Sequence, residues 1–149
     1  MFNKLISTSN DRALAILRLV LGVVFFAHGA QKVFGWFGGF GFQGTMGAMT
    51  HLGMPAGLVL LIMVTELLGG LGLIVGFLTR IPALGIIGLM IGAIFIVHLS
   101  NGFFMNWYGN QKGEGYEYHL LAIAMAAVLL LRGAGAFSLD RLLYRERSL

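Results

Sequence analysis

The charged residues of this 149-residue chain are too few for a water-soluble fold. Charged residues make up 11% of the sequence and apolar residues 58%, whereas soluble domains average about 25% charged and 45 to 50% apolar. Only seven charged side chains fall among the 119 positions from Ala13 to Leu131. A surface with so little charge suits lipid, so the sequence predicts an integral membrane protein.

The apolar region has room for four membrane-spanning helices, because each needs about 20 mostly apolar residues. The capping cluster Ser9-Asn10-Asp11 precedes the first span, and Pro55 and Pro82 mark the starts of the second and third. The predicted spans cover residues 12–34, 56–78, 82–99 and 116–132. We therefore predict a single all-α domain over residues 1–149, built as an integral membrane four-helix bundle.

The end of the chain has the pattern of a short helix lying on the membrane surface. Gly133 and Gly135 are placed to end the fourth span, and Ser138 is placed to cap a new helix. In that helix, Leu139, Leu142 and Leu143 lie opposite Arg141, Arg145 and Arg147. We expect an interfacial helix over about residues 138–146.

Positive charges predict how the chain is oriented. Seven lie at the two ends of the chain and in the connection at Arg80, whereas the connections at 35–54 and 100–115 are flanked or occupied by Lys32 and Lys112 alone. The positive-inside rule then places both termini in the cytoplasm, in a multi-pass protein of the inner (plasma) membrane. Positive residues clustered at span ends, rather than along a folded surface, also argue against nucleic-acid binding.

The residue types that are absent exclude several kinds of site. The chain has no cysteine, so it has no disulfide, thiol relay, iron–sulfur cluster or cysteine zinc site. The sequence contains no phosphate-binding glycine loop, H-E-x-x-H motif or nucleophile elbow. No two histidines have ligand spacing, so we expect no metal site and no intrinsic haem.

Glu66 is the most informative polar residue, because it falls near the middle of the second span. An ionisable group at the bilayer centre costs roughly 2.5 to 3.5 kcal/mol on insertion scales, so such residues are candidate functional sites. Gly69 and Gly70, three and four positions later, allow another helix to approach this face. Two interpretations remain open: an ion pair or hydrogen bond that fixes helix packing, or a proton-accepting or ligand-binding carboxylate.

Further polar residues gather on the first span and at the outer side of the bundle. The residues Arg18, Gly22, Phe25, Gly29 and Lys32 are spaced as one inward-facing seam, although Arg18 could instead snorkel to the cytoplasmic headgroups. The depths predict a pocket in the outer half, floored by Glu66 and ringed by His28, Gln31, Lys32, His98 and His119. We assign His51 to interfacial water, and the pairs Gly72/Gly76 and Gly88/Gly92 to helix packing.

Three segments of the chain carry a family resemblance. They are Arg18-Leu19 with Gly22 and Phe26-Ala27-His28-Gly29-Ala30-Gln31-Lys32; Glu66-Leu67-Leu68-Gly69-Gly70 with Gly76-Phe77-Leu78-Thr79-Arg80; and Gly133-Ala134-Gly135-Ala136-Phe137-Ser138-Leu139-Asp140. Together they resemble the DoxX family, small four-helix membrane proteins of the DoxD-like group, over about residues 13–140.

The resemblance implies a role in membrane redox processes, since named relatives are linked to quinone-reducing thiosulfate oxidation and to an oxidative-stress oxidoreductase complex. By matching position it implies functional roles for Arg18, His28, Lys32 and Glu66. We therefore expect a membrane subunit of a redox system. Glu66 and His28 would handle protons for a quinone or small reductant, and the pocket would include Arg18, Gln31, Lys32, His98 and His119.

Two other functions fit the same sequence. A non-catalytic scaffold would recruit a soluble oxidoreductase through the cytoplasmic arginines or the outer loops. A small-solute transporter of this length would have to act as a homo-oligomer, which glycine-faced helices permit.

Overall fold

The computed structural model describes residues 2–146, and this part of the chain is helical without a β-strand. The helices are α1 (Phe2–Ile6), α2 (Arg12–Phe34), η1 (Trp36–Gly38), α3 (Gly41–His51), α4 (Ala56–Val64), η2 (Thr65–Gly69), α5 (Gly70–Val75), α6 (Arg80–Ala93), η3 (Ile94–His98), η4 (Leu99–Asn101), α7 (Glu117–Arg132) and α8 (Leu139–Glu146). The segments η2 and η3 are π-helical turns inside longer helices. The all-α prediction is confirmed.

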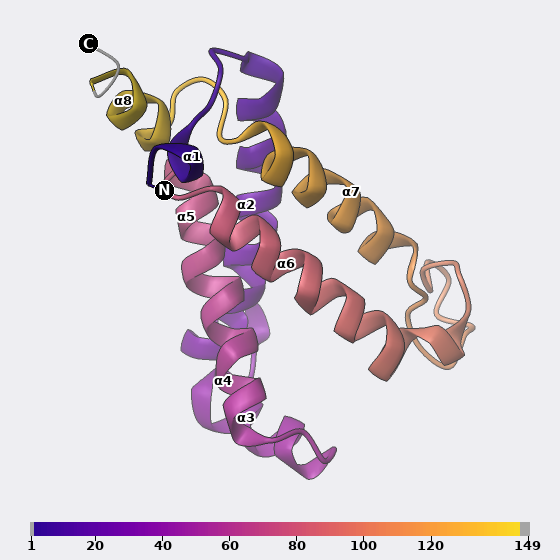
Figure 1. Ribbon diagram of the computed structural model, residues 1–149. Helices are drawn as coiled ribbons and strands as arrows, with labels where there is room; N and C mark the ends of the chain where they lie inside the picture. The colour runs from indigo at the N-terminus through magenta and orange to yellow at the C-terminus, as the bar shows by residue number, and fades with distance from the viewer. Residues whose placement is uncertain (1, 147–149) are drawn as a thin grey trace.

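The long helices form two arms that meet at one end of the molecule (Figure 1). The first arm consists of α2 and α3 packed against the continuous helix α4–η2–α5. The second arm consists of α6–η3 packed against α7, with residues 102–116 at its far end. The arms converge near α1 and α8, where both chain termini lie, and diverge away from it. Buried residues of both arms, such as Phe25, Leu73, Ile86 and Ala126, form the core.

Within residues 2–146, three helices are long and apolar enough to cross a membrane, at residues 12–34, 56–75 and 80–101. The second ends at Val75 rather than at 78, because Gly76 takes a left-handed conformation (φ 69°) that stops the helix. The helix α7 has 16 residues, or about 24 Å, which is shorter than a typical hydrocarbon core of about 30 Å. The count of four spans therefore stays a prediction.

Helix ends follow the predicted caps in three places. The Asp11 side chain accepts hydrogen bonds from the backbone N–H of Ala13 (2.8 Å) and Leu14 (3.3 Å) at the start of α2. The Ser138 Oγ accepts from Arg141 N–H (3.2 Å) at the start of α8. Gly133, with φ 82°, ends α7. On α8, Leu139 and Leu142 are exposed. The Arg145 side chain and Arg147 lie outside the described part of the chain, so the interfacial helix stays a prediction.

The connection at 35–54 is more ordered than the sequence indicated. Residues 41–51 form α3, which packs back along α2. A glycine at position 39 permits the preceding turn, because a Cβ there would overlap the backbone of Gln31. This connection is therefore part of the first arm, and it supplies one wall of the cavity described below.

Arg18 holds the convergent end together from a fully buried position. Its guanidinium donates hydrogen bonds to carbonyl oxygens of Leu73, Ile74 (2.6 Å), Ala134 (2.9 Å), Ala136 (3.5 Å) and Phe137 (3.1 Å). The first two belong to the last turn of α5, where a cation is favoured, and Leu73 O also accepts from Gly76 N–H (3.2 Å). Arg18 therefore joins α2 to α5 and to the segment after α7.

Asp140 also connects segments at this end of the molecule, and no sequence pattern indicated this role. It is buried, and its two carboxylate oxygens accept from the backbone N–H of Leu78 (2.7 Å) and Thr79 (2.9 Å) at the start of α6. Its own N–H donates to Gly76 O (2.8 Å). A carboxylate at a helix N-terminus satisfies amides that the helix leaves unpaired. This contact fixes α8 to the turn between the arms.

Candidate functional site

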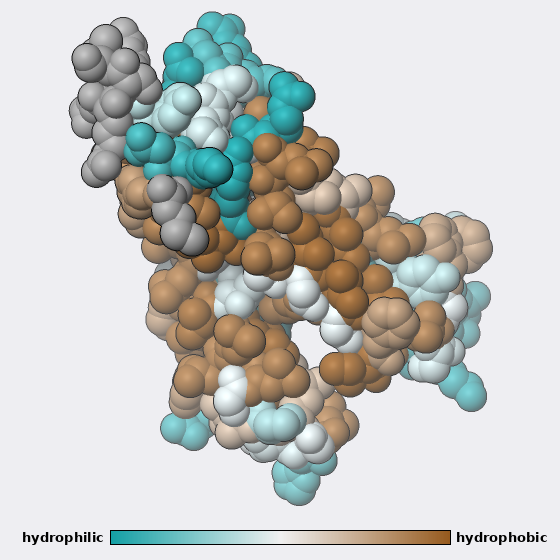
Figure 2. All heavy atoms as spheres, viewed as in Figure 1, coloured by the Kyte–Doolittle hydropathy of each residue, from teal (hydrophilic) through white to brown (hydrophobic). Residues whose placement is uncertain are grey.

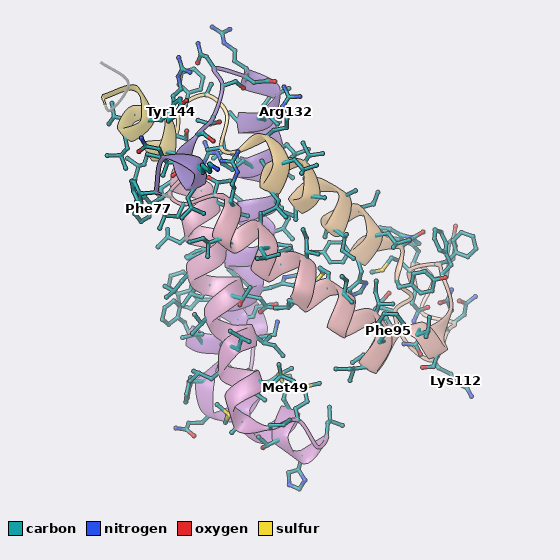
Figure 3. All side chains as sticks on the ribbon, viewed as in Figure 1. Met49, Phe77, Phe95, Lys112, Arg132 and Tyr144 are labelled. Atoms are coloured by element: carbon teal, nitrogen blue, oxygen red, sulfur yellow. The ribbon has the colours of Figure 1, made fainter. Side chains whose placement is uncertain are left out.

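A cavity of about 630 Å³ lies between the two arms. Its walls are the C-terminal part of α2, α3 and α4–η2 on one side, and α6–η3, the loop before α7 and the start of α7 on the other. Figure 2 shows the molecule hollowed at this place, with mostly apolar residues around the opening. Met49 of α3 projects into the space between the arms (Figure 3). The volume falls in the range of small-molecule sites.

The first polar group in the cavity is the ion pair between Lys32 and Glu66. Lys32 Nζ of α2 lies 2.6 Å from Glu66 Oε2 of η2, and the side chains are 24% and 5% exposed. Both residues line the cavity. Glu66 is buried, so the Lys32 ammonium compensates the charge of a carboxylate that has little contact with water.

Glycines bring the two charged residues within reach. A Cβ added at Gly29 would overlap the backbone of Leu67, and one added at Gly22 would lie 2.9 Å from Ile74 N. The backbones of α2 and η2–α5 therefore touch along the seam that the spacing predicted. The same close approach explains why position 70, on the facing helix, is a glycine, because a Cβ there would overlap the backbone of Phe26.

Gly29→Ala is expected to destabilise the protein by about 2 kcal/mol, because the new methyl group has no space in this contact. Thermal unfolding in detergent would measure the effect. Gly57→Ala is the matched control, since a Cβ at Gly57 meets nothing within 4 Å among residues 2–146. Equal stability of the two variants would show that the helices do not touch here.

The second polar group is a pair of histidines from the other arm. The rings of His98 and His119 lie 4.1 Å apart between centroids. His98 Nδ1 is 2.8 Å from the carbonyl oxygen of Glu114, which fixes its ring. His119 is buried, and within residues 2–146 neither its Nδ1 nor the buried Tyr118 hydroxyl has a hydrogen-bond partner. All four residues line the cavity.

The structure brings five of the seven predicted site residues around the cavity: His28, Lys32, Glu66, His98 and His119. The other two lie elsewhere. Arg18 is ten residues before His28 on α2, about 15 Å along the helix, and is committed to carbonyl oxygens instead of snorkelling. Gln31 Nε2 donates to Phe37 O (3.3 Å) and so closes the turn after α2.

The comparisons with known proteins identify the family. The DoxX family model matches residues 13–99. The chain belongs to the DoxX family. With its three apolar helices it is a helical membrane protein. The matched region holds Arg18, His28, Lys32, Glu66 and His98, and it ends before the start of α7.

Two curated relatives extend over nearly the whole DoxX chain. "Inner membrane protein YqjF" of Escherichia coli (strain K12) is 29% identical over 136 residues, which cover 91% of this chain and 95% of the relative. "Putative oxidoreductase CatD" of Bacillus subtilis (strain 168) is 30% identical over 132 residues, which cover 89% and 87%. No solved structure matches.

Two features of this DoxX site had no signal in the sequence. Glu66 lies in the π-helical turn η2, and His98 ends the π-helical turn η3. Such turns shift the side chains that follow them around the helix, and they are frequent at functional sites. Tyr118 and the methionines Met49, Met54, Met90 and Met105 also line the cavity, and no motif marked them.

The glycine pairs Gly72/Gly76 and Gly88/Gly92 have different surroundings in the structure. A Cβ added at Gly72 would lie 3.4 Å from Phe77 O and 3.7 Å from Pro82 Cγ, and Gly76 ends α5. Gly88 and Gly92 line the cavity, and a Cβ at either would meet nothing within 4 Å among residues 2–146. Packing inside the chain therefore does not explain this second pair.

The glutamates near the histidines mainly hold the loop before α7 in place. Glu117 Oε1 accepts from Met105 N–H (3.0 Å) and Trp107 Nε1 (3.2 Å), and Glu114 Oε2 accepts from Asn106 N–H (2.7 Å). Within residues 2–146, no three His, Asp or Glu side chains are grouped as metal ligands would be.

Proposed function

We propose that this DoxX protein binds the ring of a quinone in the cavity and exchanges protons with it, as the membrane subunit of a redox system. The observation that carries the proposal is the Lys32–Glu66 ion pair on the wall of a mostly apolar cavity. Buried charges that reach a cavity are costly to keep, and inside membranes they mark ligand or proton sites.

The cavity suits a ligand that arrives from the bilayer. Its open side lies between α4 and α6, where Leu61, Leu84 and Ile96 are each at least 60% exposed and line the opening. Apolar residues in this position face lipid tails in a membrane. A lipid-soluble ring would reach the polar groups without crossing water.

The polar groups suit a ring with carbonyl oxygens. Lys32 can donate to one oxygen, and His119 or Tyr118 can donate to another from the opposite wall. Reduction of a quinone to its quinol takes two electrons and two protons. Glu66, Lys32 and the histidines would supply and replace the protons, and the electrons would come from a reduced flavin or metal centre in a soluble oxidoreductase partner.

The relative named as an oxidoreductase supports a redox role. Purification in mild detergent, followed by lipid extraction, an absorption spectrum and quinone titration, tests the proposal. We expect co-purified quinone or saturable quinone binding. A ligand-free protein without saturable binding would contradict the proposal, and a stoichiometric oxidoreductase bound to such a protein would favour the scaffold function.

We also propose that both termini face the cytoplasm, in the inner membrane. Lys112 and Arg132 are exposed at opposite ends of the second arm (Figure 3). Because the chain lacks cysteine, single Lys112→Cys and Arg132→Cys variants can be labelled without background. An impermeant thiol reagent added to intact cells should label Lys112→Cys alone, and labelling of Arg132→Cys alone would reverse the orientation.

A further inference from the structure

Three glycines of α6 form an open strip along the cavity. Gly85, Gly88 and Gly92 are spaced at three and four positions, so they share one face of the helix, and all three line the cavity. At Gly85 a Cβ would lie 3.0 Å from Thr65 Cγ2, which is a packing contact. At Gly88 and Gly92 a Cβ would meet nothing within 4 Å among residues 2–146. Their missing side chains leave space in the cavity instead of allowing helix contact.

The strip leads to polar atoms that lack a partner. His119 lines the same cavity and is 5% exposed, and its Nδ1 has no hydrogen bond within the described residues. The Lys32–Glu66 pair lines the cavity from the other arm. A buried imidazole nitrogen without a partner indicates a polar group that is supplied by a ligand.

The strip also continues to the lipid side of the cavity. Leu84, on the same helix, is 60% exposed, and Leu61 of α4 faces the opening with 60% exposure. A molecule with its polar part at His119 would therefore have its apolar part beside the glycines and then between two apolar helices.

We propose that the glycine strip of α6 binds the apolar tail of an amphipathic, lipid-soluble ligand, and that Gly88 and Gly92 determine which tails fit. This inference rests on the proposed function, which concerns the quinone ring. It adds a binding site for the apolar tail of the same ligand. A second copy of the chain is the other occupant that suits a glycine face, but it would leave His119 and the ion pair facing an empty cavity.

Leucine at position 88 or 92 tests the proposal, because a Cβ at either position meets nothing within 4 Å among residues 2–146 and the side chain would extend into the groove. The probes are decylubiquinone and the same ring without its decyl tail, titrated into purified protein. We expect Gly88→Leu and Gly92→Leu to weaken decylubiquinone binding by about tenfold or more, since the tail would be displaced or overpacked. Binding of the tail-free ring should change by less than about twofold.

Gly57→Leu is the control, because Gly57 is exposed on α4 and a Cβ there also meets nothing within 4 Å among residues 2–146. It should bind both probes as the wild type does. Unchanged decylubiquinone affinity in both cavity variants, or equal weakening of both probes, would overturn the proposal. So would a change of oligomeric state on cross-linking with unchanged affinity, because the strip would then be an interface between copies.

If the proposed quinone-ring site is wrong, the binding experiment gives a different result from a failure of the glycine strip. If the wild type binds neither probe, the quinone function is wrong, and lipids extracted from purified protein then decide about the groove. A tailed lipid that accompanies the wild type and Gly57→Leu but not Gly88→Leu would support the groove. The same lipid content in all three proteins would overturn it.

Discussion

Arg18→Met is expected to cost about 4 kcal/mol or more of folding free energy, because buried carbonyl groups without donors cost about 1 to 3 kcal/mol each. Five carbonyl oxygens accept from this guanidinium, and they belong to α5 and to the segment after α7. Methionine keeps much of the side-chain volume but donates nothing. The convergent end of the two arms would lose its main polar connection.

The yield of monodisperse protein and its thermal unfolding temperature in detergent measure this effect. Arg12→Met is the control, since Arg12 is exposed at the first position of the same helix. It should express and unfold as the wild type does. An Arg18→Met protein as stable as Arg12→Met would show that the buried guanidinium does not hold the arms together.

Glu66→Gln is expected to lower quinone reduction in membranes by about a hundredfold, the typical contribution of a positioned acid or base. Glutamine has nearly the same shape but cannot carry the proton, and it leaves the Lys32 ammonium without its counter-ion. The same change should destabilise the protein by about 2 kcal/mol, because it leaves the Lys32 ammonium uncompensated. This is less than the roughly 3 to 5 kcal/mol of a fully buried pair, since Lys32 is 24% exposed.

The double variant Lys32→Met with Glu66→Gln separates function from packing. Replacing both charges with neutral groups is often neutral for stability, so the unfolding temperature should return toward that of the wild type. Quinone reduction should stay low, because neither the ammonium nor the carboxylate is present. Recovery of both properties would show that the pair serves only to pack α2 against η2.

The gathering of polar residues around one cavity could be predicted because it follows from helical spacing and depth along the helices. Gly29 and Lys32 share a face, and Glu66 has glycines beside it, so their meeting across two helices required no further information. Helix caps such as Asp11 were predictable for the same reason, since a cap is satisfied by neighbours within three residues.

Contacts between distant segments could not be predicted in this way. Helical spacing placed Arg18 on the correct, inward face of its helix. The carbonyl oxygens that accept from it, however, lie 55 to 119 positions away, and helical spacing does not predict contacts between such distant residues. Gly88 and Gly92 share the spacing of packing glycines, and only the divergence of the two arms turns them toward a cavity. The π-helical turns at Glu66 and His98 likewise had no signal in the sequence.

The proposal that the Lys32–Glu66 pair binds a quinone ring is tested most directly by equilibrium binding of decylubiquinone. The wild type is compared with the Lys32→Met, Glu66→Gln double variant. Thermal unfolding of both proteins in the same detergent establishes that each is folded. We expect saturable binding to the wild type, and binding to the double variant that is weaker by about tenfold or more. Equal affinities in two folded proteins, or no saturable binding to the wild type, would contradict it.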